Sequence, residues 1–303
     1  MIGEFTEECH TLEQIAKNNG LDIDNKLSNF ISDIVSSKEQ KLTKENNEEI
    51  ALMLKEQSVF DKTIAEVCGG FYFNFYGRLR DIDDAMLFRF LYLCAYMHYD
   101  GYLKDNRRLV NEEKFRKLLR LDKNVYYRTK EYLLNNELIG FDEDGFIKIN
   151  TYYCKKGKTG KIKDLEVIRM FGDSIKYIYE NSKVKEHKKL ALLVKLIPYL
   201  NFKYNILCLN TDCEHIEKII PMTLQDVAEV LGYGKTNISR LKNDLFKIKF
   251  NDELVILIIE GGYGKYIVVN PKVMYKATNS LKCFSETVEE FAKDSLYRMG
   301  SEV

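Results

Sequence analysis

Residues 224–250 read LQDVAEVLGYGKTNISRLKNDLFKIKF, and this stretch determines which fold the sequence predicts. Its first part has the composition of a short helix, and Gly232 and Gly234 provide a tight turn after it. Apolar residues then recur at spacings of three and four, at Ile238, Leu241, Leu245 and Ile248. This spacing places them on one face of a second helix that begins near Lys235. The stretch therefore predicts two helices joined by a turn.

The Gly-Lys-Thr sequence at Gly234–Thr236 could also belong to a phosphate-binding loop. That motif needs a further glycine at position 229, so that backbone N–H groups wrap the phosphate. Position 229 is Glu, whose carboxylate would repel a phosphate, and a helix precedes it where the motif requires a buried strand. The sequence therefore favours a turn within a helical pair over a nucleotide site.

The same pattern occurs earlier in the chain, which indicates an internal duplication. Residues 112–139, EEKFRKLLRLDKNVYYRTKEYLLNNELI, align with 224–250 at an offset of 112. The aligned identities are Leu119 with Leu231, Lys123 with Lys235, Arg128 with Arg240, Lys130 with Lys242 and Leu133 with Leu245. Residues 145–157 then align with 265–277 at an offset of 120, which pairs Asn150 with Asn270. The shift of eight residues predicts an insertion at a hairpin.

Each copy has one order of predicted elements. A long apolar segment comes first, at residues 85–103 in the first copy and 188–207 in the second. After the helical pair, ELIGF and FIKIN are joined by DEDG in the first copy, and LVILIIE and KYIVVN by GGYG in the second. These runs are rich in β-branched residues and predict hairpins. The order is helix, helix, turn, helix, hairpin.

This order resembles that of winged helix-turn-helix proteins, over residues 82–157 (the first copy) and 165–278 (the second copy). The chain is most similar to the tandem winged-helix origin-binding initiators of plasmids and phages, and to MarR-like regulators on mobile elements of low-GC Gram-positive bacteria. The abundance of Lys, Asn, Ile and Tyr, with no Trp, is typical of an AT-rich genome of that kind.

The resemblance implies an α+β, mostly helical fold with two winged helix-turn-helix domains in tandem and a helical N-terminal segment. The expected boundaries are 1–78 for the acidic helical segment, 79–157 for the first domain, 158–280 for the second with its basic linker and leading helix, and 281–303 for a C-terminal helix. We expect the leading helix of the second domain at residues 165–180.

A helix-turn-helix places its second helix in the major groove, so the candidate DNA-binding residues lie opposite the apolar stripe. In the second copy they are Lys235, Thr236, Asn237, Ser239, Arg240, Lys242 and Asn243, with Lys265 beside the hairpin tip. In the first copy they are Lys123, Asn124, Tyr127 and Arg128. Arg and Asn suit base edges, and Lys suits phosphates. The alternative is an ordinary solvated helix face.

The two hairpin tips differ in charge. The second copy has EGGYGK, which can approach a DNA backbone, whereas the first has Asp142, Glu143 and Asp144, which phosphate would repel. The second copy is therefore the better predicted DNA reader. The first copy would bind with its helix alone or turn toward protein contacts. The basic run KKGKTGKIKDLEVIR, at 155–169, could track a phosphate backbone or serve as a solvated linker.

Composition and charge limit the classes of function and the cellular location that the sequence allows. The chain has 46 basic and 46 acidic side chains, and this zero net charge counts against nonspecific coating of nucleic acid. Charge is uneven, however, with net −7 over residues 1–70 and net +7 over 155–195. Seven irregularly spaced cysteines indicate reduced thiols and a cytoplasmic protein. No secretory signal and no membrane-spanning run is present in the sequence.

No catalytic or metal site is predicted. Cys208, Cys213 and His215 lie close together, but no second pair of ligands completes a zinc motif. His98 falls in the apolar segment of the first copy and is interpreted as a core or boundary residue. No arrangement of a nuclease, polymerase or relaxase is evident. We therefore expect a non-enzymatic protein without cofactors.

Three functions remain open. The first, and the leading expectation, is a transcriptional regulator of a phage, plasmid or other mobile element that binds specific double-stranded DNA. The second is a replication initiator that binds repeated origin sites, which two DNA-binding units in one chain favour. The third is a protein-interaction adaptor that does not bind DNA, which the acidic tip and the acidic N-terminus favour. The N-terminal segment could mediate a homodimer or bind replication or transcription machinery. No membrane partner is expected.

Overall fold

The computed structural model describes residues 48, 62, 70–157, 167–261, 264–276 and 291. The chain divides into two compact units, Met1–Asp61 and Lys62–Val303. Glu48 is the described residue of the first unit, and it is helical and exposed. The predicted N-terminal helices up to residue 69, the linker at 158–166 and the helix at 281–303 lie outside the described residues, apart from helical positions at Glu48, Lys62 and Phe291. All other described residues belong to the second unit.

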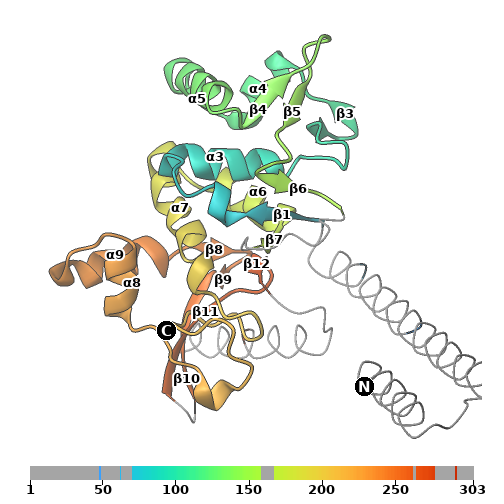
Figure 1. Cartoon of the computed structure of the whole chain (residues 1–303). Helices are drawn as coiled ribbons and strands as arrows, with labels where there is room; N and C mark the ends of the chain where they lie inside the picture. Colours follow the sequence, from blue (N-terminus) through green and yellow to red (C-terminus); the bar gives the residue numbers. More distant parts are fainter. Residues whose placement is uncertain are drawn as a thin grey trace, which may run out of the picture. The chain divides into compact units, whose positions relative to one another are not determined.

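A four-stranded antiparallel sheet joins the two copies (Figure 1). Its strand order is β12-β7-β1-β6. The strands are β1 (Phe71–Phe75), β6 (Cys154–Lys155), β7 (Val167–Phe171) and β12 (Met274–Tyr275). With β1 included, the first copy begins at Phe71, so each copy contributes one central strand and one edge strand.

The register of this sheet is symmetric between the copies. Phe73 pairs with Arg169 at the middle of the β1–β7 ladder. Phe73 also pairs with Lys155 of β6, and Arg169 pairs with Tyr275 of β12. Exchanging Phe73 with Arg169, and Lys155 with Tyr275, therefore reproduces the same pairing. The sheet has the pseudo-two-fold arrangement expected of a duplicated unit.

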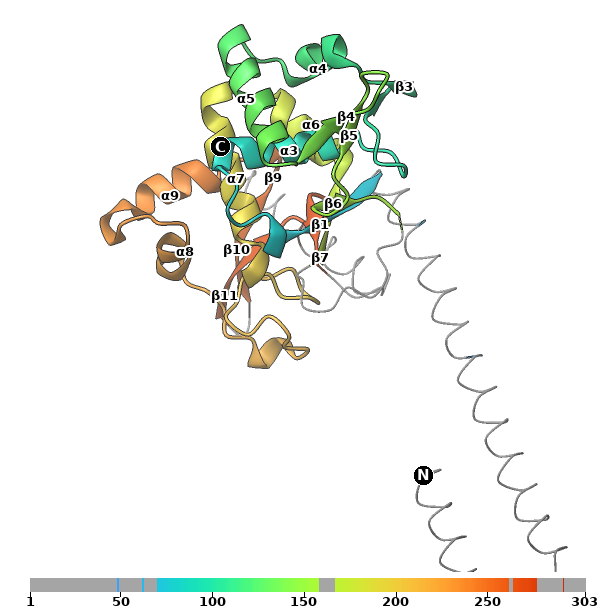
Figure 2. The same cartoon turned by 45° about the horizontal axis from the view of Figure 1, so that its top comes forward.

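The remaining elements follow a similar order in both copies (Figure 2). In the first copy they are η1 (Tyr76–Arg78), α3 (Asp84–Cys94), β2 (Lys104–Asp105), β3 (Arg108–Leu109), α4 (Glu112–Leu119), α5 (Lys123–Asn135), β4 (Ile139–Phe141) and β5 (Ile147–Ile149). In the second they are α6 (Gly172–Glu180), η2 (Val184–Glu186), α7 (His187–Lys195), η3 (Ile197–Tyr199), η4 (Ile216–Lys218), α8 (Leu224–Val230), η5 (Lys235–Asn237), α9 (Ile238–Leu245), β8 (Lys249–Phe250), β9 (Glu253–Leu254), β10 (Ile256–Gly261) and β11 (Gly264–Val269). Helices α3 and α7 lie side by side, α5 packs on α3, and α9 packs on α7.

One hydrophobic core extends through both copies. It includes Tyr72 of β1, Leu91 of α3, Ile168 of β7, Leu193 of α7 and Met274 of β12. The Tyr72 hydroxyl donates a hydrogen bond of 2.8 Å to the backbone carbonyl of Leu91, which ties β1 to α3. A second, smaller cluster packs around β10 and β11. Burial of the apolar side chains of the first, larger core, which both copies share, is the main driving force for the fold.

The expectation of two winged helix-turn-helix domains in tandem is wrong. The chain is α+β, but β1 of one copy pairs along its length with β7 of the other, and the core is shared. Neither copy can bury its central strand without the other, so the copies form one unit. The predicted helix at 165–180 is also wrong, because Val167–Phe171 is strand β7 and α6 begins only at Gly172. Phe71–Phe75, assigned above to the helical N-terminal segment, is strand β1.

Local structure within the copies follows equivalent residues. Asn111 caps α4 by accepting from Lys114 N–H, and Thr223, at the aligned position, caps α8 by accepting from Asp226 N–H. Part of the eight-residue insertion forms the additional hairpin β8–β9, between α9 and β10. Within the described residues, no helix has the length and hydropathy needed to cross a membrane.

Candidate nucleic-acid interface

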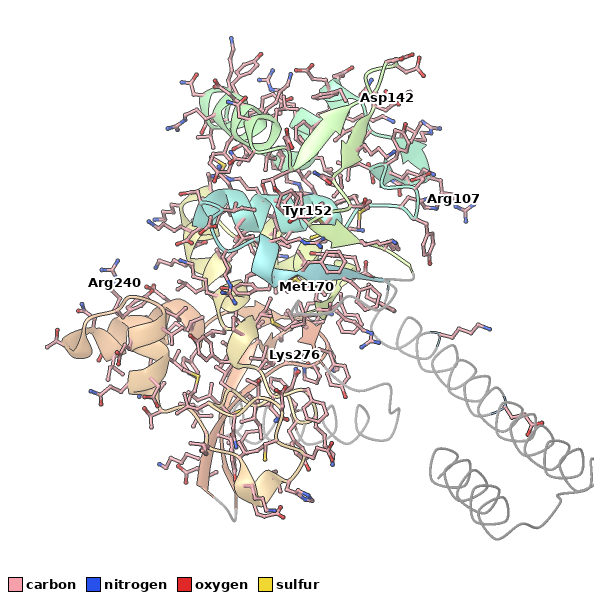
Figure 3. The ribbon with its side chains drawn as sticks, in the orientation of Figure 1. Arg107, Asp142, Tyr152, Met170, Arg240 and Lys276 are labelled. Carbon is pink, nitrogen blue, oxygen red and sulfur yellow. The ribbon has the colours of Figure 1, made fainter. Side chains whose placement is uncertain are left out.

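The outward face of α9 carries the residues that the sequence selects. Leu241 and Leu245 are buried against α7 and α8, and Ile238 is half-buried. The exposed side chains on the other faces of η5 and α9 are Thr236, Asn237, Ser239, Arg240, Lys242 and Asn243. Figure 3 shows Arg240 pointing away from the rest of the unit. The side chain of Lys235 lies outside the described part of the structure.

The turn before this helix leaves the helix start open. Gly232 has a φ of 73°, a left-handed conformation that glycine adopts without strain, and Gly234 precedes η5. Among the described residues, no side chain caps η5 or α9. In α5, by contrast, the Asp122 carboxylate accepts from the backbone N–H groups of Asn124 and Val125. Free N–H groups and the helix dipole favour a phosphate, whereas a capping carboxylate opposes one.

A buried carboxylate positions α9 and Arg240. Asp244 accepts hydrogen bonds from Lys189 of α7 and from the Tyr233 hydroxyl at 2.8 Å, and its oxygen lies 3.7 Å from Arg240 Nε. Burial alone would raise the pKa of Asp244, but the bonds from Lys189 and Tyr233 lower it below its usual value. The Arg240 side chain remains 74% exposed, so its guanidinium can still reach a partner.

The corresponding face of α5 is exposed as well. Lys123, Asn124, Tyr127 and Arg128 all lie on the surface, and Tyr127 is 50% exposed. This face also includes Glu131, so it is less uniformly suited to DNA than that of α9. The two sets belong to separate helices, one packed on α3 and the other on α7.

A buried polar cluster links α5 and α3 of the first copy to α7 of the second. Arg89 of α3 donates to the Thr129 hydroxyl of α5 at 2.8 Å and to Nδ1 of His187 of α7 at 3.2 Å. Burial, and then the positive charge of Arg89, lower the pKa of His187 to about 4. The imidazole is therefore neutral near pH 7 and can accept the bond from Arg89.

In the two hairpins, charged side chains that the sequence analysis treated as free to face DNA have partners within the protein. Lys265 forms an ion pair of 2.6 Å with Glu260, its cross-strand neighbour, so part of its charge is compensated. In the acidic tip, Asp142 accepts from the backbone N–H groups of Asp144 and Phe146 and shapes the turn (Figure 3). Glu143 and Asp144 are exposed and carry the repulsive charge.

Some residues of the site were not selected from the sequence. Asp244, Lys189 and Tyr233 were missed, although an acidic residue on the apolar face of α9 is a detectable signal of a buried partner. His98 was placed in a core or boundary position and is exposed instead, because α3 ends at Cys94. Its Nδ1 lies 3.2 Å from Lys104 Nζ, in a basic group that the sequence did not bring together.

Comparison with known proteins adds no assignment to this geometry. No family model, no curated protein and no solved structure matches the chain. Chemically, the α9 face offers amide, hydroxyl and guanidinium groups on one regular surface, with an uncapped helix start beside them. Such a surface can hydrogen-bond to base edges and to phosphate oxygens together.

Proposed function

We propose that this chain is a non-enzymatic protein that binds specific double-stranded DNA and regulates transcription on a phage, plasmid or other mobile element. The observation that carries the proposal is the exposed face of η5 and α9. Its exposed side chains from Thr236 to Asn243 include no carboxylate among the described residues, and all of them can bond to DNA. The one acidic residue of α9, Asp244, is buried and bonded to the protein.

The pseudo-two-fold sheet supports a two-part target. Since α5 packs on α3 and α9 on α7, the two candidate reading helices occupy equivalent places in the two copies. Regulators with helix-turn-helix units usually achieve this arrangement by dimerising on half-sites of opposite orientation. A single chain with two unlike reading helices would instead bind two unlike half-sites in inverted orientation. Such a site would be the operator of a regulator in which a single chain takes the place of a dimer.

Replication initiation remains the second candidate, because one chain carries both candidate helices. An initiator that bends and melts an origin generally needs a strongly basic surface, since phosphate contacts provide much of the binding energy. The zero net charge of the chain, and the ion pairs that compensate Lys117, Lys130 and Lys265, favour the regulator.

Selection of DNA fragments by the full chain tests the proposal. Sheared DNA from the encoding genome is offered at two salt concentrations, and enriched fragments are sequenced. We expect a few promoter-proximal sites. Enrichment of clustered direct repeats would favour the initiator, and no enrichment would contradict specific DNA binding altogether.

A substitution that keeps the net charge then separates the recognition of bases from electrostatic attraction to phosphates. Asn243→Ala removes an amide from the α9 face without changing net charge. We expect it to change which sequences are enriched while the salt dependence of binding stays the same, because Asn reads bases and phosphate contacts set the salt slope. Asn181→Ala, at the exposed asparagine that follows α6, is the charge-neutral control for a change elsewhere on the surface.

A further inference from the structure

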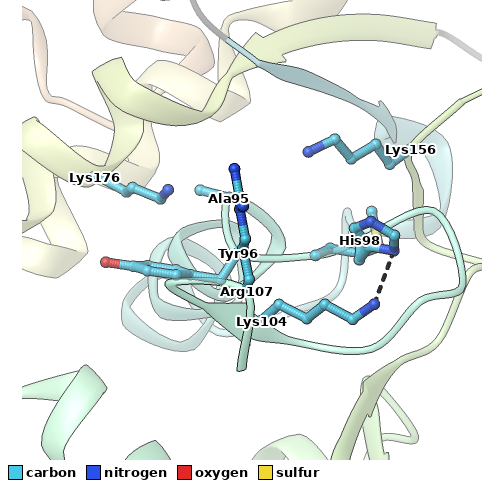
Figure 4. A pocket seen from close by; sticks show the side chains of 8 residues that line it. Ala95, Tyr96, His98, Lys104, Arg107, Lys156 and Lys176 are labelled. Carbon is cyan, nitrogen blue, oxygen red and sulfur yellow. Dashed lines mark hydrogen bonds between the residues drawn. The ribbon is translucent and has the colours of Figure 1, made fainter. Parts of the chain in front are cut away.

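A cavity of about 310 Å³ lies between the two copies, away from the face of α9. It is bounded by the residues that follow α3, by the hairpin β2–β3, by the residue after β6 and by α6. Its polar lining consists of Tyr96, His98, Lys104, Arg107, Lys156 and Lys176 (Figure 4). The first five belong to the first copy and Lys176 to the second, so the fold brings these cations together from distant parts of the chain.

The basic side chains converge on one space. In Figure 4, Lys156 and Lys176 point toward each other from opposite sides of the cavity, and Arg107 lies between them. Lys104 lies in β2, and Arg107 is the second residue of the two-residue turn that joins β2 to β3. They do not form the regular stripe of a solvated helix, because the four cations come from three separate segments: the hairpin β2–β3, the residue after β6, and α6.

The turn that presents Arg107 is conformationally demanding. Asn106 and Arg107 have φ values of 47° and 66°, the left-handed conformation that a two-residue hairpin turn requires. Asparagine accepts this conformation readily, whereas arginine rarely adopts it. A long cationic side chain therefore occupies a position where glycine would cost less.

The positive charge of the cavity is poorly compensated. Its lining includes no carboxylate among the described residues. Asp100, just outside, accepts from Lys104 at 3.1 Å and lies 3.4 Å from His98, so it offsets one of the four cations. Lys176 lies over the ring of Tyr96 at 4.2 Å, and this contact leaves its charge unchanged.

Like charges meet here at a cost. Burial, and then the charge of Lys176, lower the pKa of Lys156 below its usual value, and Asp173 opposes this only as the weakest of the three effects. The C-terminal end of α3, capped by Ala95, adds a partial negative charge of about half a unit. That contribution is small beside the charges of Arg107, Lys156 and Lys176, none of which forms an ion pair with a described carboxylate, so an anion in the cavity would relieve the repulsion.

We propose that this cavity binds a phosphorylated small molecule, with Arg107, Lys156 and Lys176 holding its phosphate groups. Guanidinium and ammonium groups that surround one space are the usual donors to phosphate oxygens. The volume is at the lower limit for small-molecule sites, which matches a di- or triphosphate group better than a large ligand. A ligand there would bridge the two copies, since Lys176 lies on α6 and the other two on the first copy.

Calorimetric titration of the full chain with magnesium-free inorganic pyrophosphate tests this site. We expect saturable binding that weakens at least about tenfold in Lys156→Gln/Lys176→Gln, because each substitution removes a charged donor to a phosphate oxygen. Lys185→Gln/Lys218→Gln removes two exposed lysines outside the cavity and should bind as the wild type does. Arg107→Gln changes one exposed residue of the turn and should also weaken binding, which guards against misfolding of the double variant.

Nonspecific duplex DNA provides the second arm, because a DNA backbone offers the same phosphate chemistry. We expect both double variants to bind DNA with equal affinity. Absence of saturable pyrophosphate binding to the wild type, or equal pyrophosphate affinity in the cavity variant and the control, would overturn the proposal. Loss of DNA affinity in the cavity variant alone, without pyrophosphate binding to the wild type, would assign the cluster to the DNA backbone instead.

Discussion

Phe73 of β1 and Arg169 of β7 face each other across the two central strands, and they occupy equivalent positions in the two copies. The Arg169 guanidinium lies 5.3 Å from the centre of the Phe73 ring. Two different residues therefore meet at the pseudo-two-fold axis, which a homodimer of identical chains could not provide. The pairing makes each copy's central strand depend on the other copy. We consequently expect the described unit to unfold cooperatively.

Two equivalent asparagines test this coupling. Asn270 is fully buried, donates to the carbonyl of Leu254 and to Glu253, and accepts from Lys272 N–H. Asn270→Ala should lower the free energy of unfolding by about 1–3 kcal/mol, because it leaves buried groups without hydrogen bonds. Urea denaturation followed by circular dichroism and by tyrosine fluorescence measures the change.

Asn150→Ala is the matched substitution in the first copy. Asn150 is half-buried, donates to the carbonyl of Glu137 and accepts from Tyr152 N–H. Its replacement should cost less than that of Asn270, since water can reach the vacated groups. Both substitutions should shift the same transition. Separate transitions for the two copies would contradict the coupling through β1 and β7.

These asparagines also show how far the sequence predicts the fold. Asn150 and Asn270 were aligned from sequence alone, and both stabilise the turn after a hairpin through the same backbone bonds. The paired helices α4–α5 and α8–α9 and both hairpins were likewise expected, because their apolar spacing and turn residues are local signals. These helices and hairpins were predicted because each depends on residues that are close together in the sequence.

The central sheet was not predicted, for physical reasons. FYFNF, in β1, is apolar or aromatic at nearly every position and lacks the alternation of a half-exposed strand. Strand β7 passes directly into α6 at Phe171–Gly172, with no side chain to cap the helix, so no start signal separates them. Both strands are defined by pairing with residues far away in the chain, and β6 and β12 have only two residues each.

The candidate interface was predicted in part. The exposure of the α9 face follows from apolar spacing, whereas the Asp244 anchor and the cavity lined by Lys156 and Lys176 depend on distant packing. No spacing rule relates Lys176 to Arg107, because their proximity results from the sheet that joins the copies.

The neutral state of buried His187 predicts a specific dependence of stability on pH. In the unfolded chain an imidazole takes up a proton near pH 6.5, but in the folded protein His187 does so only near pH 4. Between these values the unfolded state binds more protons, so the free energy of unfolding falls as pH is lowered. The fall from this residue is about 1.4 kcal/mol per pH unit, or about 3 kcal/mol in all.

His187→Gln should remove that dependence, because the amide oxygen can still accept from Arg89 but does not titrate. Urea denaturation at intervals from pH 7.5 to pH 4 measures it. His98→Gln, at an exposed histidine, is the control and should still lose stability on acidification, because it retains His187. An identical loss of stability in wild type and His187→Gln would show that another group causes the acid sensitivity.

The acidic tip of the hairpin β4–β5 should weaken DNA binding. Asp142 is left unchanged, because its carboxylate accepts the backbone bonds that shape the turn. Glu143→Gln/Asp144→Asn removes two exposed negative charges, and we expect tighter binding to nonspecific DNA and a steeper salt dependence. Fluorescence anisotropy at several salt concentrations measures both. Asp212→Asn/Glu214→Gln, at two exposed acidic residues in the loop before η4, is the control. Equal effects in the two variants would mean that overall charge, and not the position of the tip, determines affinity.

Arg240 should make the largest single contribution to sequence reading. Its guanidinium is exposed on α9, and a guanidinium can bond to guanine O6 and N7 together. Arg240→Ala should cost about 1–3 kcal/mol of binding free energy on a selected site and relax specificity at one position. Lys242→Ala should instead weaken binding uniformly across sequences and reduce the salt slope by about one.

Arg240→Lys separates charge from geometry at the same position. Lysine keeps the positive charge but cannot form the two parallel bonds, so the salt slope should stay as in the wild type while specificity falls. Binding of selected and mismatched duplexes, measured by anisotropy, distinguishes these effects. Since Arg240 also lies beside Asp244, each variant's free energy of unfolding is measured in parallel. Unchanged affinity and specificity in Arg240→Ala, with stability retained, would mean that α9 does not enter the groove through this face.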